Sequence, residues 1–118
     1  MESNPPSTQL RVTVTQPVPE TVRLELSGEL DMTGEPLLRD LSDALVLSDP
    51  EAVELDVGGL AFIDLRGLRS LGALWMNLQR RAAVTLTRTS RAFDRLLAVC
   101  SQSGAQAALP VAWATASR

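Results

Sequence analysis

Apolar and polar residues alternate in two short segments near the start of the sequence, which is the pattern of half-buried strands. The apolar positions are Leu10, Val12 and Val14 in the first segment and Val22, Leu24 and Leu26 in the second. Residues 16–20, which include two prolines, interrupt the alternation between them. The pattern therefore predicts an N-terminal hairpin.

Three later segments have the spacing of helices with one apolar face. The first runs from Glu35 to Val46, with Pro36 in its first turn, where a proline costs no hydrogen bond. The second runs from about Leu65 to Arg81 and has Asp64 as its N-cap residue. A third helix follows Ser90, which is also a good N-cap residue.

Further strands are predicted between and after these helices. Ala52 to Val57 alternates and is followed by Gly58-Gly59, which we interpret as the end of that strand. Val84 to Arg88 is another strand. The apolar stretch from Ala107 to Ala114 predicts a final strand at the margin of the sheet, because Pro110 within it lacks a backbone donor.

This order of elements predicts one α/β domain built on a mixed sheet of about five strands flanked by helices, with right-handed parallel crossovers after the hairpin. The domain spans residues 9–114. Residues 1–8 are expected to form a flexible N-terminal lead and residues 115–118 a short tail, because neither end offers apolar side chains that would dock.

Composition argues against several classes of function. The 118 residues carry a formal net charge of −3, so we expect no nucleic-acid partner. The chain has one cysteine and no histidine, lysine or tyrosine, so acid–base catalysis would rest on carboxylates and arginine alone, and we expect neither an enzyme nor a cofactor. Residues 1–8 lack the basic and apolar regions of a signal peptide and no apolar run is long enough to span a bilayer, so we expect a cytoplasmic protein without membrane insertion.

Two motifs resemble those of the STAS domain family. From Val53 to Leu78 the sequence reads VELDVGGLAFIDLRGLRSLGALWMNL, similar to the family's apolar strand, its Phe-x-Asp-Ser-Ser/Thr-Gly-Leu motif and the helix that follows. Upstream, residues 28–31 read Gly-Glu-Leu-Asp, like the family's turn after the second strand. The resemblance covers residues 9–114.

The resemblance implies an anti-sigma factor antagonist, which captures an anti-sigma factor of the GHKL kinase type and so regulates transcription. In the family, the kinase phosphorylates a serine at the start of the helix. Here Leu65 stands at that position and Arg66 at the next, so the usual phosphorylation switch is not expected. Ser70 or Thr33 would be substitute acceptors. The alternative is a scaffold or auxiliary subunit, such as a stressosome component or a subunit of a lipid-transport ATPase complex.

Helical spacing places a second stripe beside the core face of the helix after Asp64. Its members are Leu65, Arg69, Gly72 and Met76. Either the apolar members fill the margin of the core, or the stripe is a contact surface with an arginine beside an apolar centre. The partner-binding residues that we predict from the motifs and this stripe are Gly28, Glu29, Asp31, Asp64, Leu65, Arg66, Arg69 and Gly72.

Three aspartates lie near predicted strand ends, namely Asp31, Asp56 and Asp64. Carboxylates gathered at such a place hold Mg²⁺ and accept phosphate in some α/β proteins. The other interpretation gives Asp64 the role of N-cap and the rest turn or surface roles. We favour the second interpretation and expect no metal site, with a Mg²⁺-dependent phosphoacceptor as a weaker alternative.

Overall fold

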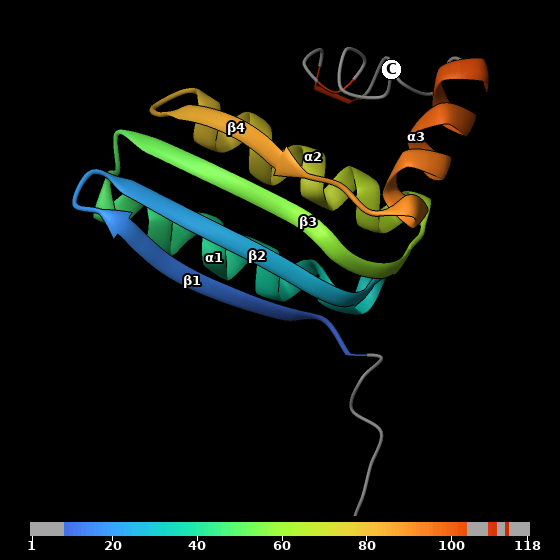
Figure 1. Ribbon diagram of the computed structural model, residues 1–118, viewed down its shortest axis with the longest axis horizontal. Helices are drawn as coiled ribbons and strands as arrows, with labels where there is room; N and C mark the ends of the chain where they lie inside the picture. Colours follow the sequence, from blue (N-terminus) through green and yellow to red (C-terminus); the bar gives the residue numbers. More distant parts are fainter. Residues whose placement is uncertain (1–8, 104–108, 111–112, 114–118) are drawn as a thin grey trace, which may run out of the picture.

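A four-stranded sheet forms the centre of the computed structural model, which describes residues 9–103, 109, 110 and 113. The strands are β1 (Arg11–Val18), β2 (Thr21–Leu30), β3 (Ala52–Ile63) and β4 (Ala83–Arg88). They lie side by side in chain order (Figure 1). The β1–β2 pair is antiparallel and the other two pairs are parallel, so the predicted hairpin and parallel crossovers are confirmed.

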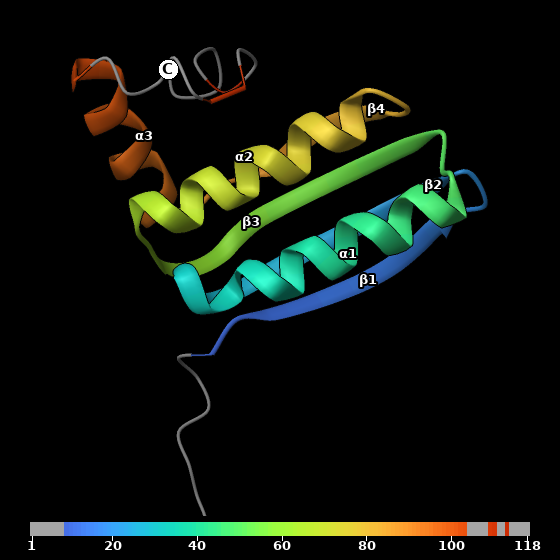
Figure 2. The ribbon, with the colours of Figure 1, turned by 180° about the vertical axis from the view of Figure 1, so that it is seen from behind.

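The three predicted helices are present. Two of them, α1 (Glu35–Ser48) and α2 (Leu65–Gln79), lie next to each other across one face of the sheet (Figure 2). The third, α3 (Arg91–Ser103), lies at one end of the sheet and contacts β3. A 3-10 turn, η2 (Met32–Gly34), joins β2 to α1.

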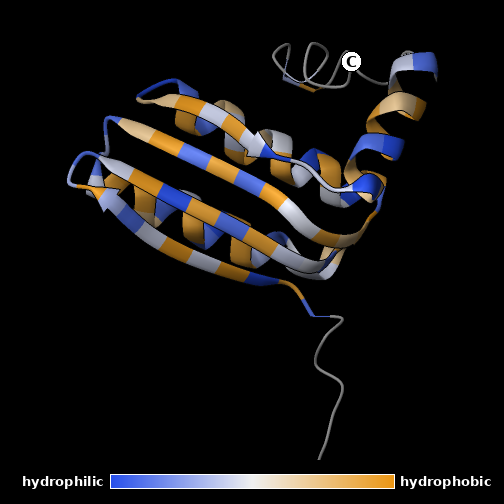
Figure 3. Ribbon diagram, in the orientation of Figure 1, coloured by the Kyte–Doolittle hydropathy of each residue, from blue (hydrophilic) through white to orange (hydrophobic). Residues whose placement is uncertain are grey.

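The core lies between this helical layer and the sheet. Apolar residues alternate along the central strands (Figure 3), so one set of side chains faces the helices. Buried members include Val22, Leu24 and Leu26 of β2, Val53, Leu55 and Val57 of β3, Leu38 and Leu45 of α1, and Leu71, Leu74 and Leu78 of α2. No helix among the described residues covers the opposite face of the sheet (Figure 1). That face carries polar side chains, and two of them, Arg23 and Glu54, form an ion pair with 2.8 Å between Nε and Oε1.

The predicted end of the third strand at Gly58-Gly59 is wrong, since β3 continues through both glycines to Ile63. The two residues permit a close approach to β2, because a Cβ atom on Gly59 would lie 2.8 Å from that of Ser27. The pairing register between β2 and β3 shifts here, after Glu25. The glycines therefore mark an irregular part of a long strand, a role that glycine often has inside sheets.

The predicted final strand, Ala107 to Ala114, lies largely outside the described residues. Its three described members, Leu109, Pro110 and Trp113, are not in a strand, so the described sheet has four strands instead of about five. Trp113 is fully buried and meets Trp75 and Phe93 edge to face, with ring centroids 5.7 and 5.4 Å away. These apolar residues cover helices instead of extending the sheet. Residues 1–8 and 115–118 also lie outside the described part.

Candidate functional site

The ends of β2 and β3 lie together at one edge of the sheet, next to the start of α2 (Figure 1). In this part of the sheet Glu29 pairs with Phe62 and Leu30 pairs with Ile63. The amide of Asp64 then donates a 3.3 Å hydrogen bond to the carbonyl of Leu30. The structure thus brings the two motifs, 28–31 and 62–68, to one place.

Aspartates cap the elements that begin at this edge. The Asp64 carboxylate accepts a 2.8 Å hydrogen bond from the amide of Gly67, which confirms its predicted role as N-cap of α2. Asp31 accepts hydrogen bonds from the hydroxyl and the amide of Thr33, at 2.6 and 2.9 Å. The hydroxyl bond, together with the amide bond, lowers the pKa of the Asp31 carboxyl below its ordinary value. Both carboxylates therefore have structural roles.

Exposed apolar side chains stand among these caps. Leu65 is 37% exposed, Phe62 is 45% exposed and Met32 is 54% exposed. We call these three residues the apolar edge. The predicted site contained Leu65 but missed the other two, although Phe62 is the aromatic residue of the Phe-x-Asp motif. Met32 had no signal beyond its place next to Asp31.

The remaining predicted site residues fall into two groups. Gly28, Glu29, Arg66 and Arg69 are exposed or half-buried at or near this edge. Gly72 is buried, and a Cβ atom on it would lie 3.3 Å from Cδ of Pro110 and 3.6 Å from Cδ2 of Leu109. The stripe predicted from helical spacing is therefore interrupted at Gly72, which packs inside the protein.

The three aspartates considered for Mg²⁺ do not meet. Asp56 lies in the middle of β3, where it accepts a 2.8 Å hydrogen bond from the amide of Gly58 and lies 3.9 Å from Nη1 of Arg88. Asp64 follows eight residues later along an extended strand, roughly 25 Å away. Within the described residues, no three acidic, cysteine or histidine side chains gather at metal-binding distance.

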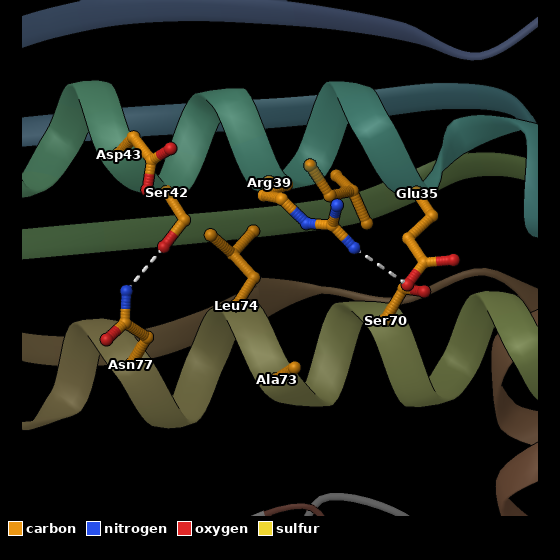
Figure 4. Close-up of a pocket in the computed structure, with 9 residues that line it drawn as sticks. Glu35, Arg39, Ser42, Asp43, Ser70, Ala73, Leu74 and Asn77 are labelled. Carbon is orange, nitrogen blue, oxygen red and sulfur yellow. Dashed lines mark hydrogen bonds and ion pairs between the residues drawn. The ribbon is translucent and has the colours of Figure 1, made fainter.

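A groove of about 290 Å³ with mixed polar and apolar lining runs between α1 and α2 (Figure 4). The Ser42 hydroxyl accepts a hydrogen bond from the Asn77 amide across it. Ser70 is half-buried in the same groove. The chain has no histidine that would activate these hydroxyls as nucleophiles. Thr33, the other substitute acceptor, is exposed and donates its hydroxyl proton to Asp31.

A model of the family described as Mlab, STAS domain, matches residues 13–106. The chain belongs to the STAS domain family. No helix of this STAS domain, among the residues that the structure describes, combines the length and apolar character needed to cross a membrane.

Several solved structures share this STAS fold. An anti-sigma factor antagonist from Mycobacterium paratuberculosis is 22% identical, with a TM-score of 0.68, and the match covers 92% of this chain and 88% of that one. The anti-sigma factor antagonist SpoIIAA in its unphosphorylated form is 22% identical, with a TM-score of 0.60 and coverage of 80% and 81%. The phosphorylated form of SpoIIAA from Bacillus is 21% identical, with a TM-score of 0.59 and coverage of 80% and 84%. No protein with a curated description matches the sequence.

Proposed function

We propose that this STAS domain binds another protein in the manner of an anti-sigma factor antagonist and is not an enzyme. Its partner is an anti-sigma factor of the GHKL kinase type, and its place of action is the cytoplasm. One observation carries the proposal: Leu65 begins α2 with its side chain exposed, at the same edge as exposed Met32 and Phe62. The solved structures with this fold include anti-sigma factor antagonists, which supports the choice of partner.

The chemistry of the apolar edge suits a protein interface. Burying a leucine, methionine or phenylalanine side chain completely is worth about 1.5–3 kcal/mol each, and these three are only partly buried in the free chain. Arg66 and Arg69 are exposed on α2, one and four residues after Leu65. Interface centres are rich in such combinations of large apolar residues and arginine.

The family resemblance implies a phosphorylated serine at the position where this chain has Leu65, so we propose that this site is permanently ready to bind. A phosphate at the start of a helix is favoured by free amide groups and the helix dipole, and its charge would repel an apolar or acidic partner. A leucine has no hydroxyl to modify. SpoIIAA, a protein with the same fold, has been solved in both phosphorylated and unphosphorylated forms.

A second candidate is an auxiliary subunit or scaffold in a larger assembly, such as a stressosome or a lipid-transport ATPase complex. The matching family model favours it, since its description is Mlab, STAS domain, and not anti-sigma factor antagonist. An interface that cannot be switched off by phosphate also fits a stable assembly.

A pull-down from native lysate with Leu65→Asp separates these proposals. Val99→Asp is the matched control, because Val99 is 58% exposed on α3 and is not part of the apolar edge. Capture of an anti-sigma kinase by the native chain and the control, with loss in Leu65→Asp, supports the first proposal. Capture of a transporter ATPase or a large oligomer with the same loss supports the second. Equal capture by all three chains rejects the apolar edge as the contact surface.

A further inference from the structure

Charge is distributed very unevenly along the chain. Up to Ile63 there are twelve acidic residues and three arginines, whereas from Asp64 onward there are two acidic residues and eight arginines. Because the strands lie in chain order, this difference in sequence becomes a difference in space (Figure 1). The side of the domain built from β1, β2 and α1 is acidic, and the side built from α2, β4 and α3 is basic.

The contrast is sharpest between the two helices of the helical layer. Asp40 and Asp43 are exposed on α1, and Arg66, Arg69 and Arg80 are exposed on α2 or at its end. Within the described part of the chain, none of these five side chains forms an ion pair. On α1 the charge of Arg39 is offset by Glu35, 3.3 Å away, which leaves Asp40 and Asp43 as the net charge of that helix. The layer therefore presents a net acidic helix directly beside a basic one.

The groove between the helices fixes how they are aligned. The hydrogen bond between Ser42 and Asn77 places these two residues at the same level along the helices (Figure 4). Asp43 follows Ser42, and Arg80 lies three residues beyond Asn77, so the two charges differ in level by only about 3 Å. Both helices connect parallel strands through crossovers and run in the same direction (Figure 2).

We propose that two copies of this chain associate through their helical layers, with α1 of one copy against α2 of the other. A two-fold axis parallel to the helices keeps each residue at its level, so Asp43 of one copy comes opposite Arg80 of the second copy. The symmetry repeats the same contact on the other side of the groove, which gives a closed dimer. The layer is complementary to itself in charge.

An anionic surface would fit the helical layer less well than a second copy of the chain does. Neighbouring packed helices have axes about 8–10 Å apart, which is close to the Debye length at physiological salt. A flat anionic surface, such as a lipid bilayer or a nucleic-acid duplex, that meets α2 would therefore also meet the carboxylates of α1. Only a partner with both charges in matching positions avoids this repulsion, and a second copy has them by construction.

The expected dimer is weak. The exposed part of the two helices, about 20 Å long and about 20 Å wide, offers roughly 400 Å² per copy, against about 800 Å² in a standard interface. Association should thus appear at high protein concentration, with dissociation constants between micromolar and millimolar. Because charge drives it, salt should weaken it strongly.

Sedimentation velocity with charge-reversed chains tests the proposal. We expect the native chain to form dimers at about 0.5 mM protein and about 0.05 M salt, and to dissociate at about 0.5 M salt. The variants R80E/R81E and D40R/D43R should each dimerise at least about tenfold more weakly, because like charges then meet. A mixture of the two variants should form a heterodimer, since the introduced glutamates on one copy then face the introduced arginines on the other, and native Asp43 and Arg80 meet on the opposite side of the groove.

The variant R91E/R95E is the matched control for R80E/R81E, because it changes the net charge by the same amount but lies on α3, outside the helical layer. It should dimerise like the native chain. A native chain that stays monomeric under these conditions overturns the proposal, as does equal dimerisation of all variants. A monomer that instead binds anionic lipid vesicles through Arg80 and Arg81 assigns the basic helix to a membrane. None of these residues belongs to the apolar edge, so a failed dimer leaves the proposed function untouched.

Discussion

Gly67, in the first turn of α2, lies against the backbone of Leu30 at the end of β2. A Cβ atom at Gly67 would come within 2.2 Å of the Leu30 carbonyl oxygen and within 2.8 Å of its carbonyl carbon. Real Cβ atoms do not approach backbone this closely, so any side chain here would push α2 away from the sheet. The absence of a side chain at this position thus sets the distance between the two motifs of the site.

Gly67→Ala should therefore destabilise the protein by about 1–3 kcal/mol, despite the higher helix propensity of alanine. Urea unfolding followed by circular dichroism would measure the change. Ser70→Ala is the control on the same helix and should stay within about 0.5 kcal/mol of the native chain. Equal stability of Gly67→Ala and the native chain would show that α2 can shift at no cost.

Asp64→Ala should remove the cap of α2 and lower the free energy of unfolding by about 0.5–2 kcal/mol. The reason is that the Gly67 amide, which now donates to the Asp64 carboxylate at 2.8 Å, loses its partner. Asp64→Asn keeps a capping oxygen and should recover most of the loss. If both variants lose the same stability, charge and not capping is the main contribution of Asp64.

The Asp31 carboxyl should titrate below its ordinary pKa of 3.8. Since the hydroxyl bond from Thr33 is the first cause of the shift, Thr33→Val should raise the pKa toward that value. A pKa that is lower in the folded chain than in the unfolded one stabilises the fold above pH 3.8, and this contribution is lost as the pH falls through the folded value. Carboxyl NMR titration of both chains checks the prediction, and an unchanged pKa in Thr33→Val would contradict it.

Trp113→Ala should lower the free energy of unfolding by about 3–5 kcal/mol, as expected when a fully buried tryptophan is removed. The loss includes the edge-to-face contacts with Trp75 and Phe93. Val99→Ala on the exposed side of α3 is the comparison and should change stability by less than about 0.5 kcal/mol. The change in the thermal unfolding midpoint distinguishes the two variants. A small effect of Trp113→Ala would mean that the segment containing it contributes little to the core.

Periodicity predicted most of the fold because burial on one side leaves a regular trace in the sequence. The alternation along β2 and the helical spacing in α2 both reflect packing against a single layer. The interpretation of Gly58-Gly59 as a strand end was wrong, since local glycine signals do not distinguish a turn from a bulged strand that needs close approach to its neighbour. That distinction depends on Ser27, more than thirty residues earlier.

The site was only partly predictable. Motif positions located Asp64 and Leu65, and capping chemistry gave Asp64 its role. Helical spacing could not reveal that Gly72 is covered, because Leu109 and Pro110 come from a distant part of the chain. Nor did any pattern indicate that Met32 is exposed, since a methionine after a strand is as compatible with the core as with the surface.

The agreement between strand order in space and strand order in the chain also bears on how the protein is made. Each strand pairs with the one synthesised just before it, so no segment has to wait for a distant C-terminal partner before it forms hydrogen bonds. The β1–β2 hairpin joins neighbouring segments, which favours its early formation, and each parallel pair needs the helix between its strands before it can close. Domains can begin to fold during synthesis. The sheet of this STAS domain can therefore grow at its open edge as the chain leaves the ribosome, with β4 the last of the described strands to be added.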